Sequence, residues 1–186
     1  MKKIILASII GLSLTTASMA SATNEVVPNL DKGTKSLDIN GSYDANTALD
    51  YQFNLGAGFG YFFIDNLEVA VVTGWQSNSL SDTFELGAVV EYNIATGTPW
   101  VPFVQAGVLW AGTEVDDDVF NDANDMDADA WLGRFGGGVK YFFRNDIALS
   151  LDLKYDIASE HIYSDDQGNM EDDNLTAGIG LRFYFD

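Results

Sequence analysis

The sequence has no cysteine and few basic residues, and both deficits exclude classes of protein. Its 186 residues include nine Lys and Arg against 28 Asp and Glu, a formal charge of −19. Without cysteine there is no disulfide scaffold, thiolate metal site, Cys nucleophile or lipidated N-terminal cysteine. The negative charge argues against nucleic-acid binding, because that affinity comes from Lys and Arg neutralising phosphates.

Long apolar runs are also missing, apart from a short one at the N-terminus. Met1-Lys2-Lys3 is a basic start, residues 4–14 are apolar, and Ser18-Met19-Ala20 supplies small residues. This pattern predicts a secretory signal peptide over residues 1–20, because the run is too short to cross a bilayer as a helix. We expect an N-terminal tail over 21–35 and one folded domain over 36–186. The sequence leaves open whether residues 24–35 form an ordered plug.

What the sequence does contain is glycine, aromatic residues and apolar positions that alternate with period two. There are 18 Gly, 12 Phe, eight Tyr and four Trp. Such alternation indicates β-strands, and most of these runs are long enough for a tilted strand to cross a bilayer. The eight predicted strands are residues 36–43, 51–63, 67–76, 83–93, 101–112, 131–143, 147–157 and 174–185.

The two faces of these strands differ in a way that favours a membrane barrel. One face carries large apolar residues such as Phe53, Leu55 and Phe59, and no charge. The other carries many glycines and the charged residues Asp38, Glu68, Glu85, Glu91, Arg134, Lys140, Asp152, Lys154, Asp156 and Arg182. An eight-stranded barrel is just wide enough for side chains to fill, and a lipid-facing Lys or Arg at midplane costs about 2–4 kcal/mol. The charged face is therefore predicted to line the lumen.

Aromatic residues gather near both ends of the predicted strands, as in interfacial girdles. One set is Tyr43, Tyr51, Trp75, Phe84, Trp110, Trp131 and Tyr155; the other is Tyr61, Phe63, Tyr92, Trp100, Tyr141, Phe143, Phe183 and Phe185. Connections alternate between short and longer, the longest being residues 113–130 and 158–173. Outer-membrane barrels keep short turns periplasmic and long loops outside. We therefore predict an all-β, eight-stranded antiparallel up-and-down transmembrane β-barrel with extracellular long loops.

A repeat sets the register expected at two short turns, because residues 58–67 align without gaps with residues 138–147. Directly paired residues must point to the same face. The expected pairs at the turns are Phe63 with Leu67 and Phe143 with Ile147.

The same register predicts ion pairs inside the lumen. It places Arg134 opposite Asp156 and Asp152 diagonal to Lys140. Barrel closure brings Arg182 to about the depth of Asp38. The alternative is that these side chains are solvated and only fill the space of the lumen. A buried ion pair is in any case weak evidence for stability.

Several segments resemble the small eight-stranded outer-membrane barrels of the outer membrane protein A, outer membrane protein X and opacity-protein type. They are residues 58–63, the turn Asp65-Asn66-Leu67, Pro102-Phe103 with Ala106-Gly107-Val108, and residues 178–185. The resemblance covers residues 36–185. It implies contact with outer-membrane lipid and lipopolysaccharide, and insertion by the outer-membrane assembly machinery. Asp186 departs from the family pattern, which ends on an aromatic residue that is read as an assembly signal.

Two predicted loops are acidic and contain no Lys or Arg. Residues 114–129 hold eight acids and residues 160–173 hold six. The alternating Asp125, Asp127 and Asp129 are weak candidate ligands for Ca²⁺ or Mg²⁺, but the EF-hand pattern is not met because Ala130 stands where its Gly belongs. A solvated, self-repelling loop is the simpler interpretation. No cofactor is predicted, and divalent cations are considered only as partners of these loops.

These features favour a monomeric outer-membrane barrel with a structural and surface-interaction, adhesin-like role. A narrow passive channel through the lumen is the first alternative. A lipid-modifying enzyme is the second, and it would depend on the only histidine, His161, flanked by Glu160 and followed by Ser164. Because that spacing matches no catalytic triad, no catalytic residue is assigned and the chain is not predicted to be an enzyme.

Overall fold

The chain forms long β-strands, seen in a computed structural model that describes residues 26–44, 52–78, 81–115, 128–160, 163–164 and 170–186. The long strands are β1 (Lys35–Asp44), β2 (Gln52–Ile64), β3 (Leu67–Asn78), β4 (Ser81–Asn93), β5 (Trp100–Val115), β6 (Ala128–Arg144), β7 (Ile147–Ala158) and β10 (Asp173–Phe185). The short β8 (Tyr163–Ser164) and β9 (Met170–Glu171) pair with each other in a separate two-stranded sheet. Among the described residues there is no helix long and apolar enough to span a membrane. The predicted signal peptide lies outside these ranges.

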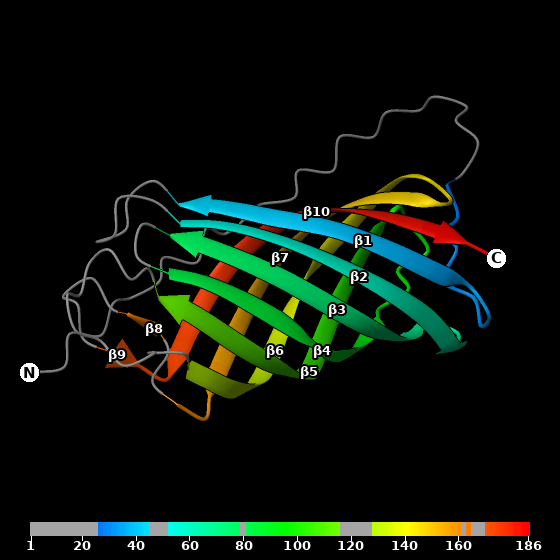
Figure 1. Cartoon of the computed structure of the whole chain (residues 1–186). Coiled ribbons are helices and arrows are strands. Elements are labelled where there is room, and N and C mark those ends of the chain that lie inside the picture. Colours follow the sequence, from blue (N-terminus) through cyan, green and yellow to red (C-terminus); the bar gives the residue numbers. More distant parts are fainter. Residues whose placement is uncertain (1–25, 45–51, 79–80, 116–127, 161–162, 165–169) are drawn as a thin grey trace, which may run out of the picture.

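The long strands close into one antiparallel barrel (Figure 1). Each strand pairs with its neighbours in the chain, and β1 completes the circle against β10. Closure gives the backbone N–H and C=O groups of the first and last strands a hydrogen-bond partner. Such a partner is needed in a bilayer, because lipid tails form no hydrogen bonds. The predicted fold is confirmed, although most strands run one to three residues beyond the expected ends.

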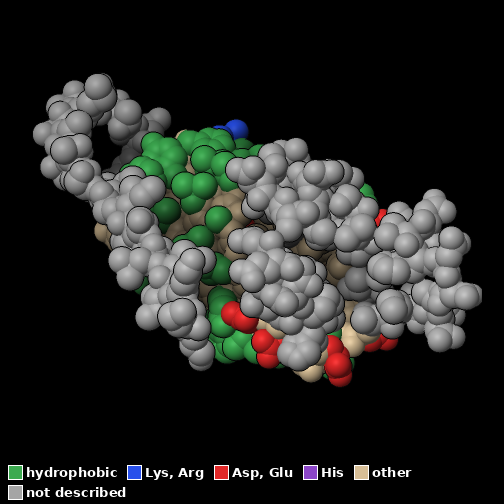
Figure 2. Space-filling model, turned by 90° about the vertical axis from the view of Figure 1, so that its left-hand side faces the viewer, with side chains coloured by type: hydrophobic (Ala, Val, Ile, Leu, Met, Phe, Trp, Pro, Cys, Tyr) green, Lys and Arg blue, Asp and Glu red, His purple; other side chains and the backbone are tan. Residues whose placement is uncertain are grey.

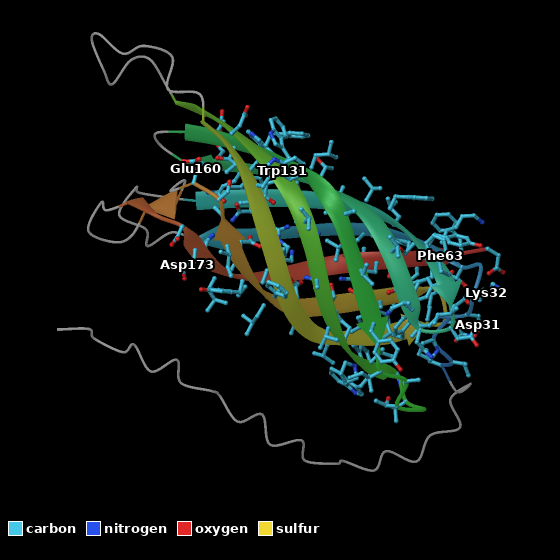
Figure 3. The ribbon with its side chains drawn as sticks, turned by 90° about the horizontal axis from the view of Figure 1, so that it is seen from below. Asp31, Lys32, Phe63, Trp131, Glu160 and Asp173 are labelled. Carbon is cyan, nitrogen blue, oxygen red and sulfur yellow. The ribbon has the colours of Figure 1, made fainter. Side chains whose placement is uncertain are left out.

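Side-chain burial confirms that the apolar face points outward and the charged face inward. Phe59, Trp131 and Leu153 are 52%, 62% and 57% exposed, whereas Lys140 is fully buried and Glu91 is 4% exposed. Phe63 lies near the short-turn end and Trp131 near the long-loop end (Figure 3). Other girdle residues with exposed rings are Tyr61, Trp75, Phe84, Tyr92, Trp100, Tyr141, Phe143, Tyr155 and Phe185. Tyr51 and the Tyr43 side chain lie outside the described part.

The expected pairing at the two repeated turns is wrong by one residue. Ile64, not Phe63, lies opposite Leu67, and the ladder shifts between Phe62 and Ile64. The second copy shifts in the same way, with Arg144 opposite Ile147. With a two-residue turn alone, side chains of the lipid face would lie opposite side chains of the lumen face. A β-bulge at Phe63, and another at Phe143, takes up the extra residue and restores the match. Beyond the bulge the register is the predicted one, so both lumen faces stay aligned.

The N-terminal residues 26–34, called the strap below, lie across the short-turn end of the barrel. Leu30 is 4% exposed and packs in an apolar cluster with residues from five strands: Phe62, Val101, Phe142, Ala148 and Tyr184. Gly33, at φ 99°, turns the chain toward β1, a conformation that glycine adopts without steric cost. Asp31 and Lys32 lie beside this end, near Phe63 (Figure 3). The described part of the predicted tail is thus packed against the barrel.

A second apolar cluster lies inside the barrel nearer the long loops. It comprises Leu109 and Ala111 of β5, Ala130 and Leu132 of β6 and Ala158 of β7. The lumen is therefore apolar at the short-turn end and along one wall, and its charges are concentrated between these regions.

Candidate functional site in the barrel lumen

All ten charged residues predicted to line the lumen are buried or half-buried inside the barrel. They form two groups, which we call the inner cluster, near the strap, and the outer cluster, nearer the long loops. The inner cluster is Asp38, Glu68, Glu91, Lys140 and Arg182. The outer cluster is Glu85, Arg134, Asp152, Lys154 and Asp156.

Glu91 is the centre of the inner cluster, because two cations from different strands, Lys140 of β6 and Arg182 of β10, contact it. Lys140 Nζ lies 2.5 Å from Glu91 Oε1 and donates to Asn93 Oδ1 at 2.7 Å. Arg182 Nη1 donates to Glu91 Oε2 at 2.8 Å, and its Nε lies 2.9 Å from Asp38 Oδ2 in an ion pair without hydrogen-bond geometry. Charge-assisted bonds of this kind are the strong ones. They tie β4, β6 and β10 together across the lumen.

Phe103 provides an aromatic face for the same two cations. Lys140 Nζ lies 5.1 Å and Arg182 Cζ 4.9 Å from the centre of its ring. Such cation–π contacts contribute more when they are desolvated. Lys140 and Arg182 therefore share one carboxylate and one aromatic ring, and Arg182 has Asp38 as a second acidic partner.

Two predicted pairs are present and one is not. Arg182 lies opposite Asp38 across the closing ladder, as expected. The Lys140 partner is Glu91 on β4, so the expected pairing of Lys140 with its diagonal neighbour Asp152 is wrong. Asp152 instead lies 3.3 Å from Lys154 Nζ on its own strand. The long lysine side chain crosses the lumen, where Glu91 and Asn93 offer it two acceptors instead of one.

Gly60 makes room for the remaining carboxylate of the inner cluster. Glu68 Oε1 accepts a hydrogen bond from Ser36 Oγ, directly over Gly60. A Cβ at position 60 would collide with both side chains. In the repeat the equivalent residue is Lys140, so one copy contributes a long side chain and the other leaves space. Glycine is thus required here by the packing of the lumen.

The outer cluster is built around Arg134, whose planar fork binds two carboxylates. Its Nε and Nη2 donate to Asp156 at 2.7 and 2.8 Å, and Nη2 also donates to Glu85 at 2.7 Å. The predicted register of Arg134 opposite Asp156 is observed. A cavity of about 100 Å³ lies beside these groups, lined also by Asn40, Asn54 and Thr176. The cavity has room for a few water molecules and is polar enough to hold them.

Sequence reasoning missed the uncharged members of the lumen. Asn93, Phe103 and Tyr184 are all buried there, and Tyr184 packs 5.2 Å from the Phe142 ring. Period-two alternation places each of them on the lumen face, so the signal was present. Aromatic residues on their own favour the lipid face, and amides carry no charge to mark them, so neither composition nor charge points to these positions.

The weaker candidates are not assembled into a site by the described residues. Asp125, Asp127 and His161 lie outside the described part of the chain, and Asp129 is exposed on β6. Within the described ranges no group of three potential metal-ligating side chains occurs.

A closed barrel with an apolar exterior and a charged interior is the architecture of outer-membrane proteins. A family model described as outer membrane protein beta-barrel domain matches residues 5–183. The chain belongs to this family. It is an outer-membrane β-barrel protein, and its place is the bacterial outer membrane. Among curated proteins, no sequence matches it.

Solved structures support the fold of this outer-membrane barrel. The N-terminal β-barrel domain of OprF from Pseudomonas aeruginosa is 19% identical, with 83% of this chain and 98% of that chain covered and a TM-score of 0.61. Neisserial surface protein A is 17% identical, with 82% and 96% covered and a TM-score of 0.60. Identities this low carry the fold to this chain, but no ligand or activity.

Proposed function

We propose that this outer-membrane barrel is a closed, monomeric structural protein that presents acidic loops outside the cell for surface interactions. Its apolar exterior would contact outer-membrane lipid and lipopolysaccharide, after insertion by the outer-membrane assembly machinery. The proposal includes no catalytic group.

The closed lumen is the observation that carries the structural part of the proposal. Leu30, Phe62, Phe142 and Tyr184 fill the short-turn end, and the ion pairs of Glu91 fill the next layer. The cavity of about 100 Å³ lies beyond them, toward the long loops. A continuous water path would require these layers to separate, so the geometry favours a structural barrel over the narrow passive channel.

The distribution of exposed charge supports the surface-interaction part. Within the described ranges, the exposed charged residues at the long-loop end are all acidic: Asp82, Asp129, Glu160 and Asp172. Exposed basic residues, such as Lys32 and Arg144, lie at the short-turn end. Figure 2 shows acidic side chains along one edge of the long-loop end. A negative outer surface would attract cationic surfaces and divalent cations, with a range set by ionic strength.

Conductance in planar bilayers tests the closed lumen. The whole mature chain should show no discrete steps, and neither should a variant with Arg134→Met, because the apolar layer at the strap remains. Discrete single-channel steps in the unmodified chain would reject the closed barrel in favour of the channel.

Orientation and loop function are tested on cells that display the chain. An epitope inserted within residues 116–127 should be labelled by antibody on intact cells, and labelling only after lysis would reverse the proposed orientation. Deleting residues 116–127 should reduce retention on a polylysine-coated surface at low salt, while the unboiled protein still migrates as a folded barrel. The control for charge at the other end is Asp31→Asn with Asp186→Asn, which removes two carboxylates where the deletion removes six. Equal retention of the deletion variant and the control would reject the loop role.

A further inference from the structure

The ladder that closes the barrel is shorter than every other ladder between long strands. β1 pairs with β10 only from Lys35–Phe185 to Gly41–Ile179. By contrast, β5 and β6 are paired from Trp100 to Thr113. Toward the long loops, β10 continues to Asp173 with β7 as its only ladder partner among the described strands. The β1–β10 seam therefore has fewer paired residues than any other ladder of the barrel.

The strap lies at this seam and is bonded on both sides of it. On the β10 side, the Asn29 amide donates to Asn145 O at 2.9 Å, in the turn after β6, and Asn29 Nδ2 lies 3.4 Å from Asp186 Oδ1. The Val27 amide donates to Asn145 Oδ1 at 3.2 Å. These bonds fix the strap to the turn that precedes β7 and to the end of β10.

On the opposite side of β1, the strap is bonded to β2 and its turn. The Lys32 amide donates to Asp65 Oδ1 at 2.9 Å, and the Asn66 amide donates to Leu30 O at 2.8 Å. Gly33 donates to Phe62 O at 2.9 Å, and Phe62 donates to Thr34 O at 2.9 Å. The strap thus spans from the turn before β7 to the turn after β2, crossing the line where β1 meets β10.

Leu30 anchors the middle of the strap in a socket shared by both sides of the seam. Phe62 belongs to β2, whereas Tyr184 belongs to β10 and Ala148 to β7. If β1 moved away from β10, either the strap bonds to Asn145 or those to Asp65 would have to break. Burial of Leu30 opposes both movements, because it would be withdrawn from its socket.

We propose that the strap is a lock for the β1–β10 seam, so that releasing it opens this seam in preference to the other ladders. Two sets of contacts would then hold the seam closed: the short β1–β10 ladder and the bonds of the strap that precedes β1. This conformational role is independent of what the acidic loops bind and of whether the lumen conducts.

Amide hydrogen exchange of the whole folded chain in detergent tests the lock. Leu30→Asp places an unpaired charge in the apolar socket and should release the strap. Exchange in peptides from β1 and β10 should become about tenfold faster or more, while peptides from β4 and β5 change by less than about threefold. The matched control is Val27→Asp, which adds the same charge to the same segment at a side chain that is 62% exposed, and it should leave all four strands unchanged.

Two milder variants keep the test decisive if Leu30→Asp does not fold. Leu30→Ala removes most of the anchor without adding charge, and Asn145→Ala removes the acceptor for the Val27 amide. Both variants should accelerate amide exchange in β1 and β10 selectively, and Leu30→Ala should have the larger effect. Equal acceleration in all four strands would overturn the proposal, as would unchanged exchange in β1 and β10, because the strap would then be a passive part of the fold.

Discussion

Replacing Lys140 by Met tests whether the inner cluster holds the barrel together. Methionine keeps an unbranched side chain out to the ε position and removes the ammonium group. Lys140 is fully buried, so the substitution deletes an ion pair with Glu91 and a hydrogen bond to Asn93 without exposing new surface. The barrel should still close, since no backbone bond is changed.

The expected cost follows from what each partner retains. Breaking a buried ion pair by removing one member costs about 3–5 kcal/mol when the other is left unpaired. Glu91 keeps Arg182 at 2.8 Å, so most of that penalty is avoided. Asn93 Oδ1 loses its short bond to Lys140, and a buried acceptor without a partner costs about 1–3 kcal/mol. We expect Lys140→Met to lower the free energy of unfolding by about 2–3 kcal/mol.

Urea titration of the barrel in phospholipid vesicles measures this difference. Tryptophan fluorescence and the shift in gel migration between folded and boiled protein should give coincident transitions. Lys32→Met, the same change at an exposed strap residue, should stay within about 0.5 kcal/mol of the unmodified chain. The double variant Lys140→Met with Glu91→Gln should cost less than the sum of the two single changes, because the two groups are in contact. A Lys140→Met variant as stable as the Lys32→Met control would refute this reasoning.

Two further substitutions test the lipid face and the packing of the lumen. Phe59→Lys, near the middle of β2, should destabilise the barrel by about 2–4 kcal/mol, whereas Phe63→Lys in the girdle should cost about 0–1 kcal/mol; equal costs in the same urea titration would mean that the exterior does not sense membrane depth. Gly60→Ala should cost about 1–3 kcal/mol through overpacking against Glu68, whereas a Cβ at Gly58 would meet its nearest atom, on Val72, at an ordinary 3.4 Å. If Gly58→Ala and Gly60→Ala unfold at the same urea concentration, the lumen is looser than its geometry implies.

Contacts between neighbouring strands could be predicted from the sequence, because they depend on alternation and register alone. Arg134 with Asp156 and Arg182 with Asp38 are pairs of this kind. The pairing next to the turn, Ile64 with Leu67, could not be predicted from the sequence. A β-bulge at Phe63 changes this pairing without changing the alternation that precedes it. A bulge changes the backbone pairing at a turn, and the pattern of apolar residues does not indicate where it occurs.

The sequence by itself determined that the chain is a barrel with an inverted distribution of polarity, since period two assigns every strand residue to one of two faces. Only the tertiary structure decided which lumen side chains meet across the barrel. Lys140 joins Glu91 because barrel closure brings β6 and β4 to opposite sides of a narrow interior. The position of the strap likewise depends on the tertiary structure. Residues 26–34 do not predict a socket for Leu30, because that socket forms only when β2, β5, β6, β7 and β10 come together.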